Sequence, residues 1–69
     1  MMYYVIANKD NSKFIAIDSN SGGYPYETNY FPHAKIGLYE SINEEYKDLD
    51  NCGIDSSEYF IKKVVIINF

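Results

Sequence analysis

Residue types that commonly carry catalytic or structural chemistry are scarce in this 69-residue sequence. It has no arginine and no tryptophan, one histidine (His33) and one cysteine (Cys52). A lone cysteine cannot close an intramolecular disulfide or build a cysteine-rich metal site. One histidine without arginine leaves few groups to stabilise a charged transition state. We therefore expect a protein that is not an enzyme and that carries no cofactor or metal ion.

Positive charge and long apolar runs are also in short supply. Six lysines stand against ten acidic residues, for a net charge of −4. Because phosphate neutralisation dominates nucleic-acid affinity, this balance argues against direct nucleic-acid binding. The apolar run at residues 64–67 is far below the ~18 residues that a membrane span needs, and no basic segment precedes the first apolar residues, as a signal peptide requires. The sequence thus predicts one soluble, intracellular domain over residues 1–69.

The sequence is well supplied with β-branched and aromatic residues. Residues 3–7 and 13–18 are two such runs on either side of a turn-forming cluster, a pattern typical of a β-hairpin with a five-residue loop. The glycine pair at 22–23 then permits positive φ and a sharp reversal. Residues 24–32 form either a short edge strand or an ordered loop, because Pro25 lacks the N–H that an interior strand donates.

The second half of the chain predicts a strand and then a helix. Residues 34–39 have the composition of a further strand, and a helix is expected over residues 42–51. Ser41 and Glu44 have the spacing of a capping box, which places the helix start at Ser41. The apolar residues of this helix recur on one face, at Ile42, Tyr46 and Leu49.

The last twelve residues, from Glu58 to Phe69, carry the strongest strand pattern. Both faces of this strand are apolar, which predicts a central strand covered on both sides. One helix covers one face, so the other face needs either the tyrosine-rich segment or another subunit, and a homo-oligomer through this strand is a possible outcome. The element order is β-β-(β)-β-α-β, and the fold class is α+β: a small, mostly antiparallel sheet with one helix packed on one face.

Three tyrosines after the glycine turn form the first candidate partner-binding surface. They are Tyr24, Tyr26 and Tyr30. They flank a proline in a conformationally restricted segment, and rigid amphipathic rings of this kind are common at protein interfaces. The alternative is that the rings simply cover the open face of the sheet, and the sequence leaves both possibilities open.

Acidic residues form the second candidate surface, because seven of the ten lie within residues 40–58. Such a segment would steer a basic protein partner towards itself. The alternative is an ordinary solvated helix face. The acidic residues assigned to partner binding are Glu40, Glu44, Glu45, Asp48 and Asp50.

Six short stretches span most of the chain. They read Tyr-Val-Ile-x-Asn-Lys-Asp, Lys-Phe-Ile-Ala-Ile-Asp, Gly-Gly-Tyr-Pro-Tyr, Ala-Lys-Ile, Ser-Ile-Asn-Glu-Glu and a closing Lys-Lys-Val. In this order they resemble the small accessory proteins of phages and mobile elements in low-GC bacteria. The understood members of that group are often inhibitors of host systems, including anti-CRISPR and other anti-defence proteins, and they act by binding. The resemblance implies this class and a location in the cytoplasm of the host bacterium, and it supplies no site residues.

These observations lead to three functional hypotheses. The first is a non-enzymatic binding protein of phage or mobile-element origin that inhibits a host protein, with a defence nuclease as the leading candidate. It would bind through the tyrosine segment and the acidic helix. The second is a homo-oligomeric structural or regulatory module that associates through the last strand. The third is a binder of a small molecule, such as a nucleotide signal, that uses residues 24–30.

Overall fold

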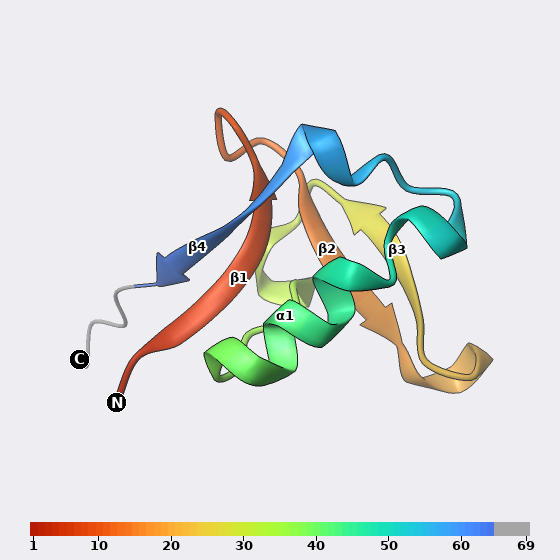
Figure 1. Ribbon diagram of the computed structural model, residues 1–69, viewed down its shortest axis with the longest axis horizontal. Helices are drawn as coiled ribbons and strands as arrows, with labels where there is room; N and C mark the ends of the chain where they lie inside the picture. The colour runs from red at the N-terminus through yellow and green to blue at the C-terminus, as the bar shows by residue number, and fades with distance from the viewer. Residues whose placement is uncertain (65–69) are drawn as a thin grey trace.

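The computed structural model describes residues 1–64, which contain one four-stranded sheet and one α-helix. The elements are β1 (Tyr3–Asn8), β2 (Phe14–Asp18), β3 (Tyr24–Thr28), α1 (Tyr39–Lys47) and β4 (Tyr59–Val64). The strand order is β3-β2-β1-β4, every neighbouring pair is antiparallel, and α1 lies on one face (Figure 1). This arrangement confirms the predicted α+β class and the hairpin of β1 and β2. It also shows that the segment after the glycine turn is an edge strand.

The main hydrophobic core lies between the sheet and α1. β1 and β4 pair along their whole length, with Ile6 opposite Ile61, so alternate residues of each strand face the helix. Ile42 and Leu49 are fully buried and Tyr46 packs at the margin of the core, which confirms the predicted apolar stripe. The buried members of this core are Ile6, Ile15, Ile42, Leu49, Ile54 and Tyr59.

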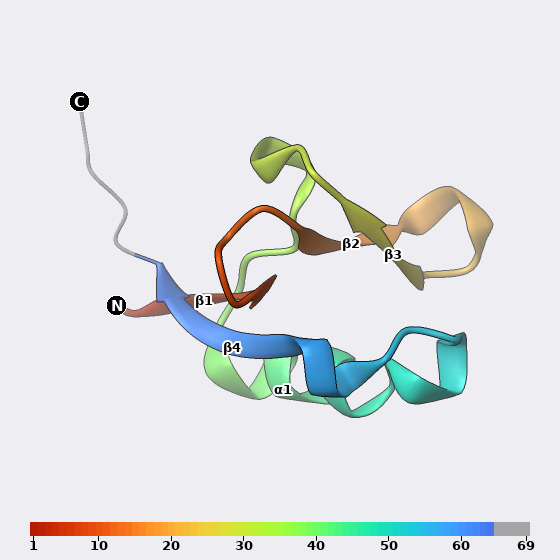
Figure 2. The same ribbon diagram turned by 90° about the horizontal axis from the view of Figure 1, so that it is seen from above.

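The opposite face of the sheet has a smaller core of its own. Val5, Ala7 and Phe14 are buried there, and Ala34 packs against them. The ring of Phe31 meets that of Phe14 edge-on, with centroids 5.1 Å apart. Phe31 belongs to the 3₁₀ turn η2 (Phe31–His33), which lies on the side of the sheet away from α1 (Figure 2). Within the described residues, the second cover of the sheet therefore includes the segment that follows β3.

The chain passes through the sheet between β1 and β2 on its way from η2 to α1 (Figure 2). β1 and β2 share one residue pair, Ala7 opposite Phe14, and beyond it the segment of residues 35–37 lies between them. Lys35 N–H donates to the Ile15 carbonyl of β2 at 3.0 Å. On the other side, Gly37 exchanges two hydrogen bonds with Tyr4 of β1, at 2.8 and 3.2 Å. The crossing segment thus provides hydrogen-bond partners for backbone groups of Tyr4 and Ile15 that would bond between β1 and β2 if the two strands paired along their whole length.

The predicted strand over residues 34–39 is wrong. Residue 37 forms an isolated bridge with Tyr4 and no strand extends from it. The physical reason is direction, because the segment runs across the sheet from one face to the other. Each neighbouring strand therefore meets it at a single place.

The predicted start of the helix is wrong as well. α1 begins at Tyr39, its N-cap is Leu38, and no side chain caps it, so Ser41 lies inside the first turn and the capping box with Glu44 does not form. The bridge at Gly37 fixes the chain close to α1, and Ile42 N–H already donates to the Leu38 carbonyl at 3.1 Å. At the other end α1 stops at Lys47, four residues before the predicted limit of 51.

The last strand lies at an edge of the sheet in this chain rather than at its centre. β4 has β1 on one side and no neighbour on the other among the described residues. The interior positions belong to β2 and β1, and Val5, Ile6 and Ala7 of β1 are at most 4% exposed. Residues 65–69 of the predicted strand lie outside the described residues.

Gly37→Pro should lower the free energy of unfolding by about 2 kcal/mol, because it removes the N–H that bonds the Tyr4 carbonyl. Gly37→Ala is the matched control, since an added Cβ would meet Ile42 and Ser41 at an ordinary 3.8 Å, and its effect should stay within about 0.5 kcal/mol. Urea unfolding followed by circular dichroism measures both. Equal midpoints for the two variants would contradict the role of the crossing segment.

Candidate functional site

The tyrosines of the first candidate surface lie on the side of the sheet away from α1. Tyr24 stands opposite Asp18 and Tyr26 opposite Ala16, so the two rings share a face of β3. Tyr30 directly precedes η2 on that side. The exposed fractions are 65% for Tyr24, 41% for Tyr26 and 54% for Tyr30, so a large part of each ring is open to solvent. We call these three residues the tyrosine ridge.

Both ends of the tyrosine ridge are held by local contacts. At one end, the Tyr30 ring packs edge-on against His33 with centroids 4.6 Å apart, and Tyr30 N–H donates to Thr28 Oγ1 at 3.1 Å. At the other end, the Tyr24 ring lies over Gly22, where an added Cβ would be 3.5 Å from its Cε2 atom. The ridge is therefore supported on both sides by backbone that is itself fixed.

The turn before Tyr24 explains why glycine is needed there. Gly22 and Gly23 have φ of 84° and 81°, a conformation that side chains with a Cβ rarely adopt. Asp18 closes the turn, because its Oδ1 accepts from Asn20 N–H at 3.0 Å and its carbonyl accepts from Gly23 N–H at 2.9 Å. The predicted sharp reversal is confirmed.

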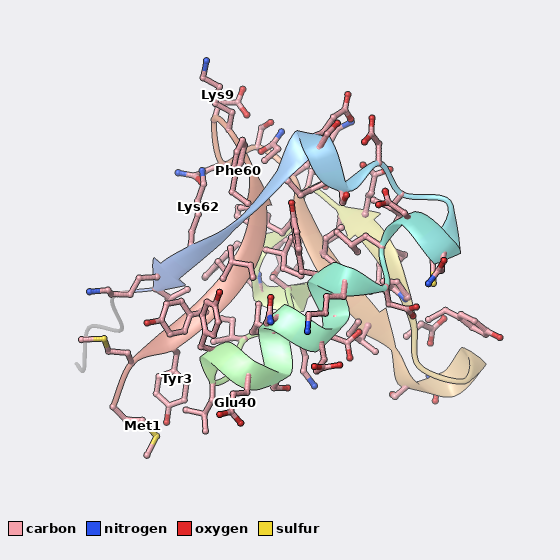
Figure 3. All side chains as sticks on the ribbon, viewed as in Figure 1. Met1, Tyr3, Lys9, Glu40, Phe60 and Lys62 are labelled. Atoms are coloured by element: carbon pink, nitrogen blue, oxygen red, sulfur yellow. The ribbon has the colours of Figure 1, made fainter. Side chains whose placement is uncertain are left out.

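The exposed side of α1 carries Glu40 and Glu44, and Asp48 at its C-cap continues the interval of four residues. We call these three carboxylates the acidic row. Glu40 lies at the start of the helix (Figure 3). Glu44 Oε1 is 3.6 Å from Lys47 Nζ, and because both groups are exposed this pair contributes little to stability. Asp48 Oδ1 accepts from Asn51 Nδ2 at 3.2 Å. The row thus remains largely available to solvent.

The other two predicted acidic residues have different surroundings. Asp50 uses both carboxylate oxygens inside the chain, accepting from the Ser56 N–H at 3.0 Å and from its Oγ at 2.9 Å. These bonds hold the loop that leads into β4. Glu45 is half-buried. Asp50 therefore stabilises this loop, a role that the sequence did not indicate.

The two candidate surfaces meet at the glycine turn. A shallow hollow there is lined by residues of the turn and of α1, namely Gly23, Glu44, Glu45, Lys47, Asp48 and Asn51. Tyr24 directly follows this hollow in the chain, whereas Tyr26 and Tyr30 lie further along the other side of the sheet. The structure thus places the predicted residues on two adjoining surfaces rather than in one patch.

The histidine and the cysteine both lie outside any reactive cluster. His33 is exposed and contacts Tyr30. Burial, followed by the hydrogen bond to Asp48 and the charges of Asp48 and Glu45, raises the pKa of the Cys52 thiol. Within residues 1–64, no three histidine, cysteine or acidic side chains gather as a metal site. In the same part of the chain, no helix has the length and apolar character to cross a membrane.

A buried hydroxyl joins the two edge strands of the sheet. Tyr59 of β4 is 2% exposed, and its hydroxyl donates to Glu27 Oε2 of β3. Burial first, and then the hydrogen bond to Glu27 and its charge, raises the pKa of Tyr59 above the ordinary value. Tyr46 supports the same end of β4, because its hydroxyl donates to the Tyr59 carbonyl at 3.1 Å.

A lysine ties β4 to the β1–β2 hairpin. Lys62 Nζ donates to the carbonyls of Asn8 at 2.7 Å and Lys9 at 3.1 Å, and to Asn11 Oδ1 at 2.7 Å. Figure 3 shows Lys62 and Lys9 at the same end of the molecule. Because its three donors are all used inside the chain, Lys62 is part of the fold and not a free surface charge.

Comparisons with protein-family models, with curated proteins and with solved structures returned no match. The two surfaces are accordingly described by their own geometry. Two sets of hydrogen bonds were not predicted from the sequence. One joins Tyr59 to Glu27, and the other joins Lys62 to the hairpin loop. Each joins residues more than thirty positions apart, for which a single sequence carries no local signal.

Tyr59→Phe should lower the free energy of unfolding by about 1 kcal/mol at neutral pH, because the bond to Glu27 is lost. The raised pKa of Tyr59 means that the folded state holds this proton more tightly than the unfolded state. Its contribution is complete below the unfolded pKa of about 10 and is lost as pH rises above it. Urea unfolding at several alkaline pH values should show a steeper decline for the wild type than for Tyr59→Phe.

The matched control is Tyr30→Phe, which removes an exposed hydroxyl. Its stability should follow the wild-type curve at every pH. Parallel curves for the wild type and Tyr59→Phe would contradict the proposed linkage.

Proposed function

We propose that the protein acts by binding another protein. In full, it is a non-enzymatic inhibitor of phage or mobile-element origin that binds a host protein, with a defence nuclease as the leading candidate. The observation that carries this proposal is the exposure of the tyrosine ridge, whose rings stand 41–65% open to solvent over a sheet face that Phe31 and Ala34 already cover in part. Exposed tyrosines on a fixed scaffold are the side chains that most often anchor interfaces.

The fixed backbone beneath the ridge supports the same proposal. Association costs free energy when loops and side chains must be ordered on binding. Tyr24 and Tyr26 belong to a paired strand, and Tyr30 packs against His33. Little ordering therefore remains to oppose binding, and a small chain gains useful affinity from few contacts.

The acidic row favours a partner with a basic surface. Glu40, Glu44 and Asp48 lie on the exposed side of α1, and the chain carries a net charge of −4. Nucleases hold their substrates largely by neutralising phosphates with basic side chains. A negative helix complements such a surface and speeds encounter with it. This complementarity is the reason for choosing a nuclease among host proteins.

Tyr26→Ala should weaken binding to the target by about tenfold or more. Its effect on stability should be small, because the ring is exposed. Calorimetric titration against purified defence nucleases, together with inhibition of their cleavage, measures the loss. Tyr39→Ala is the matched control, since Tyr39 is also exposed, at 49%, but lies on α1 and contacts Tyr4. A nuclease panel that the wild type neither binds nor inhibits would contradict the proposal.

Reversing charge on the acidic row tests the electrostatic part separately. The double variant Glu44→Lys with Asp48→Lys should slow association with the target, and it should flatten the dependence of the association rate on salt. Surface plasmon resonance at several salt concentrations measures both. Glu58→Lys is the control for a charge change away from α1. If the control and the double variant slow association by the same factor per charge reversed, the net charge of the protein explains the effect. That outcome would contradict a specific role for the acidic row.

A further inference from the structure

The backbone of β4 turns part of its hydrogen-bonding groups away from the sheet. In β1, Tyr4 and Asn8 direct their N–H groups to Gly37 and Lys13, on the side away from β4. Backbone groups alternate sides along an antiparallel strand. The odd residues of β1 therefore face β4, and the register of Val5 opposite Lys62 makes the even residues of β4 their partners. Tyr59, Ile61 and Lys63 consequently point their N–H and C=O groups outwards.

Among residues 1–64, no strand pairs with this outer edge. Figure 1 shows β4 along one side of the sheet. The Tyr59 carbonyl is bonded to Tyr46, whereas Ile61 and Lys63 have no side-chain or loop partner within residues 1–64. Such an edge is a ready template for another strand.

We propose that a second copy of this chain pairs antiparallel with β4, about a two-fold axis at Ile61, and that the two sheets become one. The sequence of residues 58–69 is apolar on both faces, a pattern typical of a central strand. In the isolated chain β4 is an edge strand. Pairing between two copies would place β4 in the interior of the joined sheet, which is the position that its apolar pattern predicts.

The charges along β4 select the register and favour a second copy as the occupant. Outward residues must face outward residues, and within Tyr59–Val64 the two registers with the longest overlap then have their axis at Ile61 or at Lys62. An axis at Lys62 sets Lys62 directly opposite itself, and like charges in that position are destabilising. An axis at Ile61 sets Lys63 opposite Tyr59 and Lys62 opposite Phe60, a ring that is 47% exposed. That register contains no like-charge pair between residues 59 and 63, so the edge is complementary to itself.

Lys63→Pro tests the pairing without touching the bonds between β4 and β1. Its N–H points outwards, so proline removes a donor that only the second copy would use, and proline is tolerated at strand edges. Lys63→Ala is the matched control, because it also removes the charge but keeps the N–H. Sedimentation equilibrium up to about 1 mM protein, where weak self-association is still detected, should show a dimer for the wild type and Lys63→Ala and a monomer for Lys63→Pro.

Hydrogen exchange locates the interface on the same samples. The amides of Ile61 and Lys63 should exchange more slowly as the protein concentration rises, while those of Phe60 and Lys62 should be protected at every concentration. If Lys63→Pro unfolds, a synthetic chain methylated at the Lys63 amide nitrogen replaces it. A wild type that stays monomeric at the highest concentration overturns the proposal, as does a dimer that survives loss of the Lys63 donor. Tyr26→Ala should leave the dimer intact, which separates this inference from the proposed inhibitor function.

Discussion

The exchange of two hydrogen bonds between Tyr4 and Gly37 is the contact on which the rest of the fold depends. It holds the crossing segment inside the gap between β1 and β2, together with the bond from Lys35 to Ile15. Because the chain is fixed at Gly37, α1 begins two residues later and sets Ile42 against the core. On the other face, the same path leaves Phe31 and Ala34 over Phe14. One local pairing thus supplies cover for both sides of the sheet.

Because α1 and the segment after β3 supply this cover, the rings of the tyrosine ridge remain exposed. A sheet must bury its apolar faces against other elements. Here the helix covers one face, and the turn after β3 contributes to the cover of the other. Tyr24, Tyr26 and Tyr30 are left outside, on backbone that the glycine turn and the β2 pairing hold in place. β4 lies at an edge because β2 and β1 occupy the two interior positions of the sheet.

The sequence predicted correctly those parts of the structure that depend on interactions between residues close together in the chain. The hairpin, the glycine reversal, the edge strand with Pro25 and the apolar stripe through Ile42 all depend on residues close together in the chain. The strand expected at residues 34–39 failed because its β-forming residues cross the sheet instead of joining it. The cap at Ser41 failed because a tertiary contact at Gly37 starts the helix earlier. The candidate residues were found by composition, but only the structure separates Asp50, bonded to Ser56, from the exposed acidic row.

The single residue pair between β1 and β2 also constrains how the chain folds. Extending the register of Ala7 opposite Phe14 would pair Ile6 with Ile15 and Tyr4 with Ile17, and β-branched and aromatic residues favour such pairing. A hairpin zipped that far would close the gap that residues 35–37 occupy. Hairpins form within microseconds, so local pairing beyond Ala7 and Phe14 competes with the native arrangement. The native structure therefore depends on the crossing segment, which takes hydrogen bonds of Tyr4 and Ile15 that a longer hairpin would use between β1 and β2.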